Sequence, residues 1–241
     1  MSRTDDPISL PVRRVMPEHG VKPDVRQWPM TIPAVRQIVT DGLVLGRATI
    51  LVGANGSGKS TLIEAIAACY GLNPEGGSTG ARFSTAATES PLAESLRLVR
   101  GIAAPRWGYF IRAETMHGLF SYLGERDAHF HRLSHGEAFL TMLMDRRFEK
   151  DGFYVLDEPE AGLSYPTQLK LLAELIAITE REKSQLLIAT HSPVIAALPG
   201  ARLVQLDDSG MRETSWSEVD AVADYRRFLA DPDSVLRHLR E

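Results

Sequence analysis

The sequence contains a single cysteine, Cys69, so no disulfide can form within the 241-residue chain. This composition fits a reducing compartment. Cys69 lies in the apolar run at residues 66–70, where we expect a small buried side chain rather than a reactive thiol. No apolar run approaches the roughly 20 residues that a membrane-spanning helix needs, and residues 1–7 lack the apolar segment of a signal peptide. We therefore expect a cytoplasmic protein with no direct membrane insertion.

The sequence also lacks an excess of basic residues. It has 27 Lys and Arg against 31 Asp and Glu, which gives a net charge of −4. This balance excludes a global positive field that would attract nucleic acid, although it leaves room for a local basic patch. There is no internal repeat and no heptad run, so a long coiled-coil insertion is excluded. The length suits one α/β domain, with or without a small subdomain.

Short apolar runs alternate with amphipathic segments along the chain. We predict strands at residues 47–52, 107–111, 153–156, 186–189 and 202–206, and helices at residues 59–71, 92–100, 137–149, 167–181 and 217–240, the last interrupted near residue 231. Residues 1–35 are predicted to be an irregular arm with one or two short strands, and residues 71–91 a surface loop. The alternation predicts an α/β fold, with a mostly parallel central sheet flanked by helices.

The predicted organisation is a single domain over residues 1–241. It has a small N-terminal β arm, a short helical subdomain inserted over residues 92–150 and a helical C-terminal tail over residues 207–241.

The strongest motif is the run Gly-Ala-Asn-Gly-Ser-Gly-Lys-Ser-Thr at residues 53–61, which matches the P-loop pattern G-x-x-x-x-G-K-[ST]. A predicted strand precedes it and a predicted helix follows it. Glycines let backbone N–H groups close around a phosphate at a helix N-terminus. Lys59 is expected to reach the β- and γ-phosphates, and Ser60 to ligate Mg²⁺. The predicted nucleotide-binding residues here are Gly53, Asn55, Gly56, Ser57, Gly58, Lys59, Ser60 and Thr61.

The segment Phe-Tyr-Val-Leu-Asp-Glu at residues 153–158 is predicted to be a Walker B strand. It is an apolar strand that ends in two carboxylates at the edge where parallel sheets bind ligands. Asp157 would hold Mg²⁺, and Glu158 would orient and deprotonate the attacking water. The alternative is a buried strand capped by acids before Pro159. We favour the Walker B interpretation because the segment follows a P-loop in the expected order.

A third motif, Leu-Ser-His-Gly-Glu, occupies residues 133–137. Ser134 as the N-cap and Glu137 at the N3 position would make a capping box for the predicted helix. The same arrangement presents a hydroxyl, backbone N–H groups and a helix N-terminus to an anion lying ahead of it. The two interpretations are compatible.

His191 follows the predicted strand at residues 186–189, at the sheet edge where ligands bind. An imidazole there could contact the γ-phosphate or the attacking water. The alternative is a structural histidine beside Ser192, which would cap the next helix ahead of Pro193. The histidines at positions 129, 131 and 135 lack a metal-ligand pattern, so a zinc site is not expected.

Together these segments resemble the ABC-type ATPase superfamily. The resemblance rests on the P-loop, Leu-Ser-His-Gly-Glu, Leu-Asp-Glu-Pro-Glu at residues 156–160 and Ala-Thr-His-Ser-Pro at residues 189–193, and it covers most of residues 45–195. In detail the chain is more similar to soluble SMC/RecF-like and "AAA family" ATPases than to transporter subunits. The resemblance implies a P-loop NTPase fold, ATP and Mg²⁺ as ligands, and hydrolysis of ATP to ADP and phosphate.

The resemblance also implies roles for individual residues. Ser134 and Gly136 would belong to a signature motif that contacts the γ-phosphate held by a second subunit. His191 would be the switch histidine, and residues 160–164 would form the D-loop. Glu114 stands where the family has its Q-loop glutamine, which would place it near the metal.

Two departures from the family pattern concern the site between subunits. His135 replaces the usual signature glycine, and Ser164 stands where the D-loop commonly has aspartate. The aromatic residue that stacks on the base is not identified by a motif, although Trp28 is a candidate.

These observations support three functions. The first is a homodimer that closes head to tail on ATP and senses or remodels nucleic acid, or acts in repair or defence, with nucleic acid or another protein as the partner. The second is the nucleotide-binding subunit of a membrane transporter. The third is a regulatory nucleotide switch with little turnover, against which the presence of both Asp157 and Glu158 argues.

Overall fold

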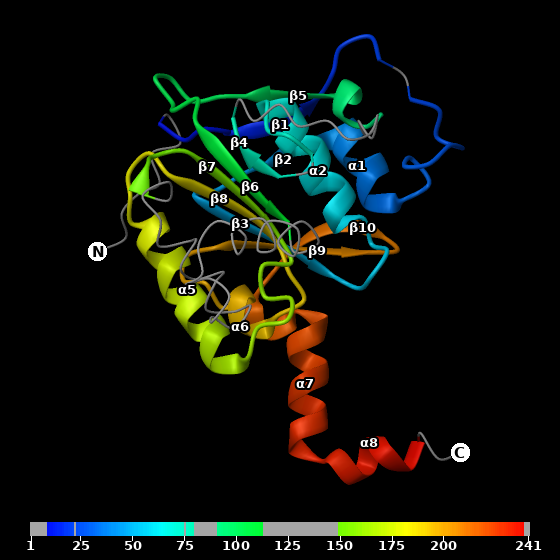
Figure 1. Ribbon diagram of the computed structural model, residues 1–241. Helices are drawn as coiled ribbons and strands as arrows, with labels where there is room; N and C mark the ends of the chain where they lie inside the picture. The colour runs from blue at the N-terminus through cyan, green and yellow to red at the C-terminus, as the bar shows by residue number, and fades with distance from the viewer. Residues whose placement is uncertain (1–8, 22, 75, 80–90, 113–148, 239–241) are drawn as a thin grey trace, which may run out of the picture.

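The computed structural model describes residues 9–238 except 22, 75, 80–90 and 113–148 (Figure 1). Its main sheet has seven strands in the order β10-β9-β3-β8-β7-β6-β4. The five inner strands are parallel: β9 (Arg202–Asp207), β3 (Ala48–Gly53), β8 (Gln185–Ala189), β7 (Phe153–Asp157) and β6 (Gly108–Arg112). The edge strands β10 (Gly210–Thr214) and β4 (Gly77–Ser78) are antiparallel to their neighbours. The predicted α/β fold with a mostly parallel sheet is confirmed.

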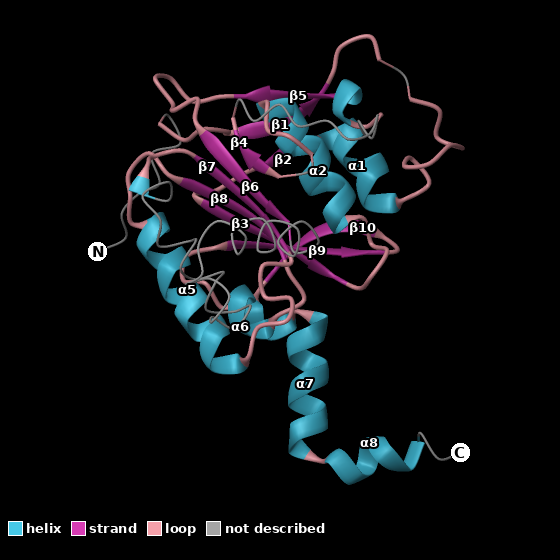
Figure 2. Ribbon diagram, in the orientation of Figure 1, coloured by secondary structure: helices cyan, strands magenta, loops and turns pink. Residues whose placement is uncertain are grey.

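Helices cover both faces of this sheet (Figure 2). Leu51 of β3 lies in one apolar core with Leu62 of α2 (Lys59–Tyr70), on the side of α1 (Pro33–Asp41). Its neighbour Ile50 lies in the other core with Leu171 of α5 (Tyr165–Thr179), on the side of α6 (Pro193–Ala196). Successive residues of a strand point to opposite faces, so a strand covered on both faces must be apolar throughout. This is why the inner strands could be predicted as short apolar runs.

A second, three-stranded sheet lies near α2, with the order β2-β1-β5. It consists of β1 (Arg14–Pro17), β2 (Leu43–Val44) and β5 (Leu96–Val99), all antiparallel. The helix predicted at residues 92–100 is therefore wrong, since only the 3₁₀ turn Ala93–Ser95 precedes β5. Pairing of Val15 with Leu98 supplies the backbone hydrogen bonds that a helix would otherwise have made.

Helix α1 lies in a stretch that was predicted to begin as an irregular arm. Pro33 occupies the first helical turn, where a missing N–H costs nothing. The helix buries Ala34, Val35 and Ile38 against the core that it shares with α2. Burial of this apolar face explains why a nine-residue helix is stable here.

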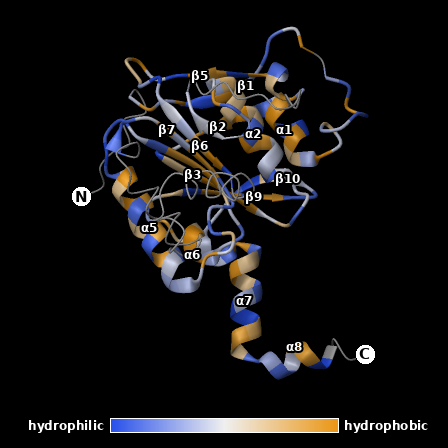
Figure 3. Cartoon of the chain, in the orientation of Figure 1, coloured by the Kyte–Doolittle hydropathy of each residue, from blue (hydrophilic) through white to orange (hydrophobic). Residues whose placement is uncertain are grey.

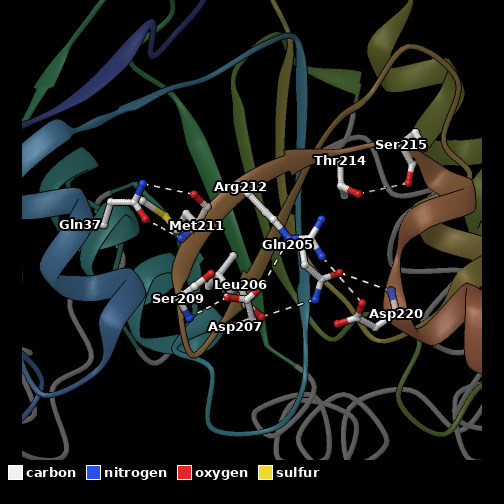
Figure 4. Close-up of polar contacts among 10 residues, drawn as sticks. All are labelled: Gln37, Gln205, Leu206, Asp207, Ser209, Met211, Arg212, Thr214, Ser215 and Asp220. Atoms are coloured by element: carbon white, nitrogen blue, oxygen red, sulfur yellow. Dashed lines mark hydrogen bonds and ion pairs between the residues drawn. The ribbon is translucent and has the colours of Figure 1, made fainter.

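A hairpin of β9 and β10 occupies the first part of the predicted helical tail. The side-chain amide of Gln37 donates to the carbonyl of Met211 at 3.2 Å and accepts from its N–H at 2.5 Å, which ties α1 to the edge strand (Figure 4). Beyond the hairpin come the 3₁₀ turn Trp216–Glu218, α7 (Asp220–Ala230) and α8 (Pro232–His238). The described part of the tail is therefore largely helical between Trp216 and His238, with the predicted break between Ala230 and Pro232.

Helices α7 and α8 project from the body of the protein (Figure 1). Both carry hydrophobic bands between hydrophilic ones (Figure 3). Within the predicted subdomain at residues 92–150, the described part up to Arg112 contains β5, β6 and the 3₁₀ turn Ala93–Ser95, but no α-helix. The helix predicted at residues 137–149 lies almost entirely outside the described residues.

Candidate nucleotide-binding site

The P-loop connects β3 to α2 through backbone conformations that favour glycine. Gly53, Gly56 and Gly58 have φ angles of 149°, 80° and 99°. A Cβ on Gly53 would lie 2.3 Å from the carbonyl oxygen of Leu206, and a Cβ on Gly58 would lie 2.8 Å from Cγ2 of Ile32. No side chain caps the N-terminus of α2, so its first-turn N–H groups have no side-chain partner. Such a helix end binds anions readily.

Lys59 is almost fully buried beneath the loop, with 4 % of its surface exposed. Its ammonium donates to the carbonyl oxygens of Gly53 at 2.9 Å and Ala54 at 3.0 Å. Burial lowers the pKa of Lys59, while the carboxylates of Glu158, Asp157 and Glu160 oppose that shift. The ammonium therefore lies inside the loop, where phosphate oxygens could replace the two carbonyl oxygens as its hydrogen-bond acceptors.

Ser57 provides a second sign that the loop is built for a ligand. Its Oγ is buried and has no hydrogen-bond partner among the described residues. A buried hydroxyl without a partner is costly, and a phosphate oxygen would satisfy it. Elsewhere in the motif, Asn55 is exposed and Thr61 is half-buried at the start of α2.

The end of β7 meets the start of α2 through Ser60 and Asp157. The Ser60 hydroxyl donates to Oδ1 of Asp157 at 3.1 Å. Burial raises the pKa of Asp157 to about 6, and the hydrogen bond from Ser60 and the charge of Arg112 oppose this shift. Nearby Glu158 and Glu64 raise it further. A hydroxyl beside a desolvated carboxylate suits Mg²⁺, which takes one or two protein oxygens and completes its shell with water and phosphate oxygens.

Glu158 and His191 lie next to each other at the same sheet edge. Nε2 of His191 is 3.2 Å from Oε1 of Glu158, a distance typical of an ion pair, although the alignment does not meet hydrogen-bond geometry. Glu158 has a φ angle of 49°, in the left-handed region that non-glycine residues rarely adopt. Such strain is often found at functional positions. The structure thus brings together two residues that are 33 positions apart in the sequence.

Three further polar residues support the site through contacts that the sequence did not predict, although Glu160 was expected to begin the D-loop. Glu160 accepts hydrogen bonds from the segment that carries His191, and Gln168 of α5 contacts Ser192. Arg112, which is paired in register with Asp157, forms an ion pair of 2.6 Å with Glu64 of α2. The position of Glu160, two residues after Glu158, could have indicated that it lies near the site. That position does not reveal which residues it would contact.

Several predicted site residues lie outside the described residues. These are Ser134 and Gly136 of the signature motif, the neighbouring His135, and Glu114. Trp28, the candidate for base stacking, is 63 % exposed. It lies in the arm that reaches the P-loop, since Ile32 packs close to Gly58.

No group of three or more His, Cys, Asp or Glu side chains among the described residues could hold a metal ion. No helix in the described part of the chain is long and apolar enough to cross a membrane.

Comparison with known families identifies the chain. The family described as "AAA domain, putative AbiEii toxin, Type IV TA system" matches residues 48–150 and 138–197, which together span more than half of the 241 residues. The chain belongs to this family. It is a P-loop ATPase of the ABC type, as its sequence motifs predicted.

Its relatives with curated names include transporter subunits. An "Uncharacterized ABC transporter ATP-binding protein" of Haemophilus influenzae is 27% identical over 184 residues, which is 65% of this chain and 68% of that protein. The "Aliphatic sulfonates import ATP-binding protein SsuB 3" of Nocardia farcinica is 29% identical over 208 residues, 80% of this chain and 77% of that protein. Among solved structures, the SMC head domain from Thermotoga maritima aligns with a TM-score of 0.42 at 14% identity, covering 72% of this chain and 92% of that one.

Proposed function

We propose that this ATPase hydrolyses ATP with Mg²⁺ at the edge formed by the P-loop, β7 and the loop after β8. The hydrogen bond between Ser60 and Asp157 carries this proposal, because it brings two of the predicted metal-site residues, from separate motifs, within 3.1 Å of each other. When bound, Mg²⁺ would neutralise phosphate charge and position the triphosphate. Lys59 and the N–H groups of residues 53–61 would hold the phosphates.

In this mechanism Glu158 is the base that receives the proton of the attacking water. His191, 3.2 Å from Glu158, would orient that carboxylate or contact the terminal phosphate. The strained φ angle of Glu158 supports a functional role, because an unstrained turn would be more stable if the side chain had no task.

We further propose that ATP closes two copies of the chain head to tail. The signature motif of one copy, including Ser134 and Gly136, would complete the site over Lys59 of the other. Binding energy from the nucleotide would then favour the dimer, and hydrolysis would release it. Repair and defence are the candidate processes, and the toxin–antitoxin description of the family supports defence.

Replacing Glu158 with Gln tests both parts of this proposal. The amide keeps the shape of the side chain but cannot accept the proton, so ATP turnover should fall by about 100-fold or more, while ATP still binds. With ATP and Mg²⁺ the variant should accumulate as a dimer in light scattering. Normal turnover in Glu158→Gln would refute the role of Glu158, and a monomer under these conditions would refute ATP-driven dimerisation.

The matched control is Glu180→Gln, at an exposed position at the end of α5, which should turn over ATP normally. Omission of Mg²⁺ should abolish turnover in every variant. Measuring turnover with and without single- and double-stranded DNA at two salt concentrations tests a nucleic-acid partner, because phosphate contacts weaken steeply with salt.

A second candidate function is that of an ATP-binding subunit for a membrane transporter. The observation in its favour is that named relatives are transporter ATP-binding proteins. Stimulation of ATP turnover by a membrane protein encoded beside this one, with none by DNA, would favour this alternative.

A further inference from the structure

The chain segments after β7 and β8 continue side by side beyond the end of the sheet. The last paired residues of these strands are Asp157 and Ala189. One residue later, the N–H of Glu158 donates to the carbonyl oxygen of Ala189 at 2.9 Å. The N–H of Thr190 donates to the carbonyl oxygen of Leu51 in β3 at 3.1 Å. The chain then leaves the sheet and enters α6, so the N–H groups of His191 and Ser192 need a partner outside the sheet.

Glu160 is that partner. Its Oε1 accepts from the Thr190 hydroxyl at 2.6 Å, from the N–H of His191 at 2.8 Å and from the N–H of Ser192 at 3.1 Å. The other oxygen, Oε2, is buried and has no hydrogen-bond partner among the described residues. The hydrogen bonding of this carboxylate is thus concentrated on three consecutive residues.

We propose that Glu160 is a positioning residue that sets the place of the His191 imidazole through the backbone of residues 190–192. The inference rests on the proposed function, because it gives His191 a task in ATP hydrolysis. Glu160 and Glu158 belong to the same turn, so the carboxylate that holds the backbone of His191 moves together with the carboxylate that the imidazole faces. The distance of 3.2 Å between His191 and Glu158 follows from this common attachment.

Gln168 of α5 reinforces the arrangement from a third element. Its Oε1 accepts from the Ser192 hydroxyl at 2.7 Å, and its Nε2 donates to the carbonyl oxygen of Leu163 at 3.1 Å. The Ser192 hydroxyl in turn accepts from the N–H groups of Val194 and Ile195 at the start of α6. The loop that carries His191 is therefore fixed at both ends, by Glu160 and by Gln168.

The test compares Glu160→Ala with Glu160→Gln. Alanine removes all three acceptor contacts, whereas one glutamine oxygen can keep them and its NH₂ group can occupy the place of Oε2. Two quantities are measured: hydrogen exchange of the backbone amides of residues 191 and 192 without nucleotide, and kcat and KM for ATP. Thermal unfolding identifies a variant that fails to fold, and Glu180→Ala serves as the exposed control.

In Glu160→Ala we expect amide exchange at His191 to rise by about tenfold or more as the loop opens locally. Exchange at Ser192 should rise less, because its N–H also donates to the Thr190 hydroxyl at 2.9 Å. The kcat should fall on the order of 10- to 100-fold, because small displacements of catalytic groups are costly. The KM should change by less than about threefold, since the P-loop is intact. Glu160→Gln should stay within about threefold of the wild type in both measurements, because glutamine keeps the acceptor oxygen. If the negative charge of Glu160 were what matters, Glu160→Gln would lose activity as well.

Three results would overturn the proposal. These are unchanged exchange in Glu160→Ala, an unchanged kcat despite faster exchange, or an equal loss of kcat in the alanine and glutamine variants. If the wild-type protein shows no turnover at all, the proposed function fails by itself. In that case amide exchange still decides whether Glu160 holds the loop.

Discussion

Replacing Asp157 with Asn should stabilise the protein in the absence of nucleotide and Mg²⁺. Asp157 is 6 % exposed, and burial raises its pKa to about 6. The ordinary aspartate pKa is about 3.9, and each pH unit of difference corresponds to about 1.4 kcal/mol. The ionised carboxylate therefore lowers the free energy of unfolding at neutral pH by about 3 kcal/mol. Asparagine removes the charge and can still accept from Ser60.

The sign of the pH dependence follows from the raised pKa. Below about pH 3 Asp157 is protonated in both the folded and the unfolded state, so ionisation of this group costs the folded state no stability. The folded state loses stability as the pH rises from about 4 through about 6. In this range the unfolded state ionises Asp157 freely, whereas burial opposes its ionisation in the folded state. The advantage of Asp157→Asn should be about 3 kcal/mol at pH 7.5, roughly half of that at pH 5 and only a small fraction of it at pH 4.

Urea unfolding of both proteins across this pH range, with EDTA present, measures the difference directly. At neutral pH the melting temperature of Asp157→Asn should be about 6–12 °C higher for a chain of this size. Asp208→Asn, on the exposed turn between β9 and β10, is the matched control and should differ by less than about 0.5 kcal/mol at every pH. Equal or lower stability of Asp157→Asn at pH 7.5, or a gain that does not vary with pH, would refute the reasoning.

Two further variants test the P-loop. Lys59→Ala removes a buried ammonium that would contact the phosphates. The ATP affinity measured by titration calorimetry should fall about 10- to 100-fold, the loss expected for a hydrogen bond to a charged group. An unchanged affinity would exclude Lys59 from phosphate binding. Gly58→Ala would place Cβ 2.8 Å from Ile32 at a φ angle of 99°, so urea unfolding should show a loss of about 2–5 kcal/mol. Gly56→Ala, with a φ angle of 80° and no atom within 4 Å, should cost only about 1–2 kcal/mol, and equal losses would show that contact with Ile32 is unimportant.

Much of the central sheet could be predicted because its inner strands face apolar layers on both sides. The strand β7 is buried at all five positions, and β8 likewise, which leaves an apolar run bounded by polar residues. The helix α2 could be predicted down to its end, since Gly71 takes the left-handed conformation that commonly ends a helix. These elements depend on residue patterns within one short segment, which can be recognised from the sequence alone.

The elements that were missed depend on partners distant in sequence. Residues 96–99 form β5 because β1 pairs with them. The sequence is ambiguous here, because Leu92, Leu96 and Val99 also have the spacing of a helix face. The edge strand β10 is largely polar and only Gly210 is buried, so it lacks an apolar run. The turn residues 207–210, Asp-Asp-Ser-Gly, were the available signal for a hairpin there.

The same distinction applies to the candidate site. Residues 53–61 could be predicted because backbone conformation and phosphate binding both require particular residue types in one short segment. The roles of Glu160, Gln168 and Arg112 could not, because each depends on a contact across the fold: with residues 190–192, with Ser192, and with Glu64. A glutamate or glutamine has many possible partners, and only the register of β7 and β8 selects these ones.

The local costs of the fold are concentrated at the carboxyl ends of β3 and β7. Lys59 and Asp157 are buried with pKa values moved toward their neutral forms, Ser57 lacks a partner among the described residues, and Glu158 holds a left-handed backbone. Ala189 of the intervening strand β8 is in register with Leu51 of β3 and with Asp157 of β7, so the ends of these three strands lie side by side. Phosphate oxygens would satisfy Lys59 and Ser57, and a divalent cation would favour ionised Asp157. A ligand that removes several penalties at once binds more tightly than its contacts alone would give, so adding ATP and Mg²⁺ should stabilise the wild type more than Asp157→Asn and reverse their order of stability.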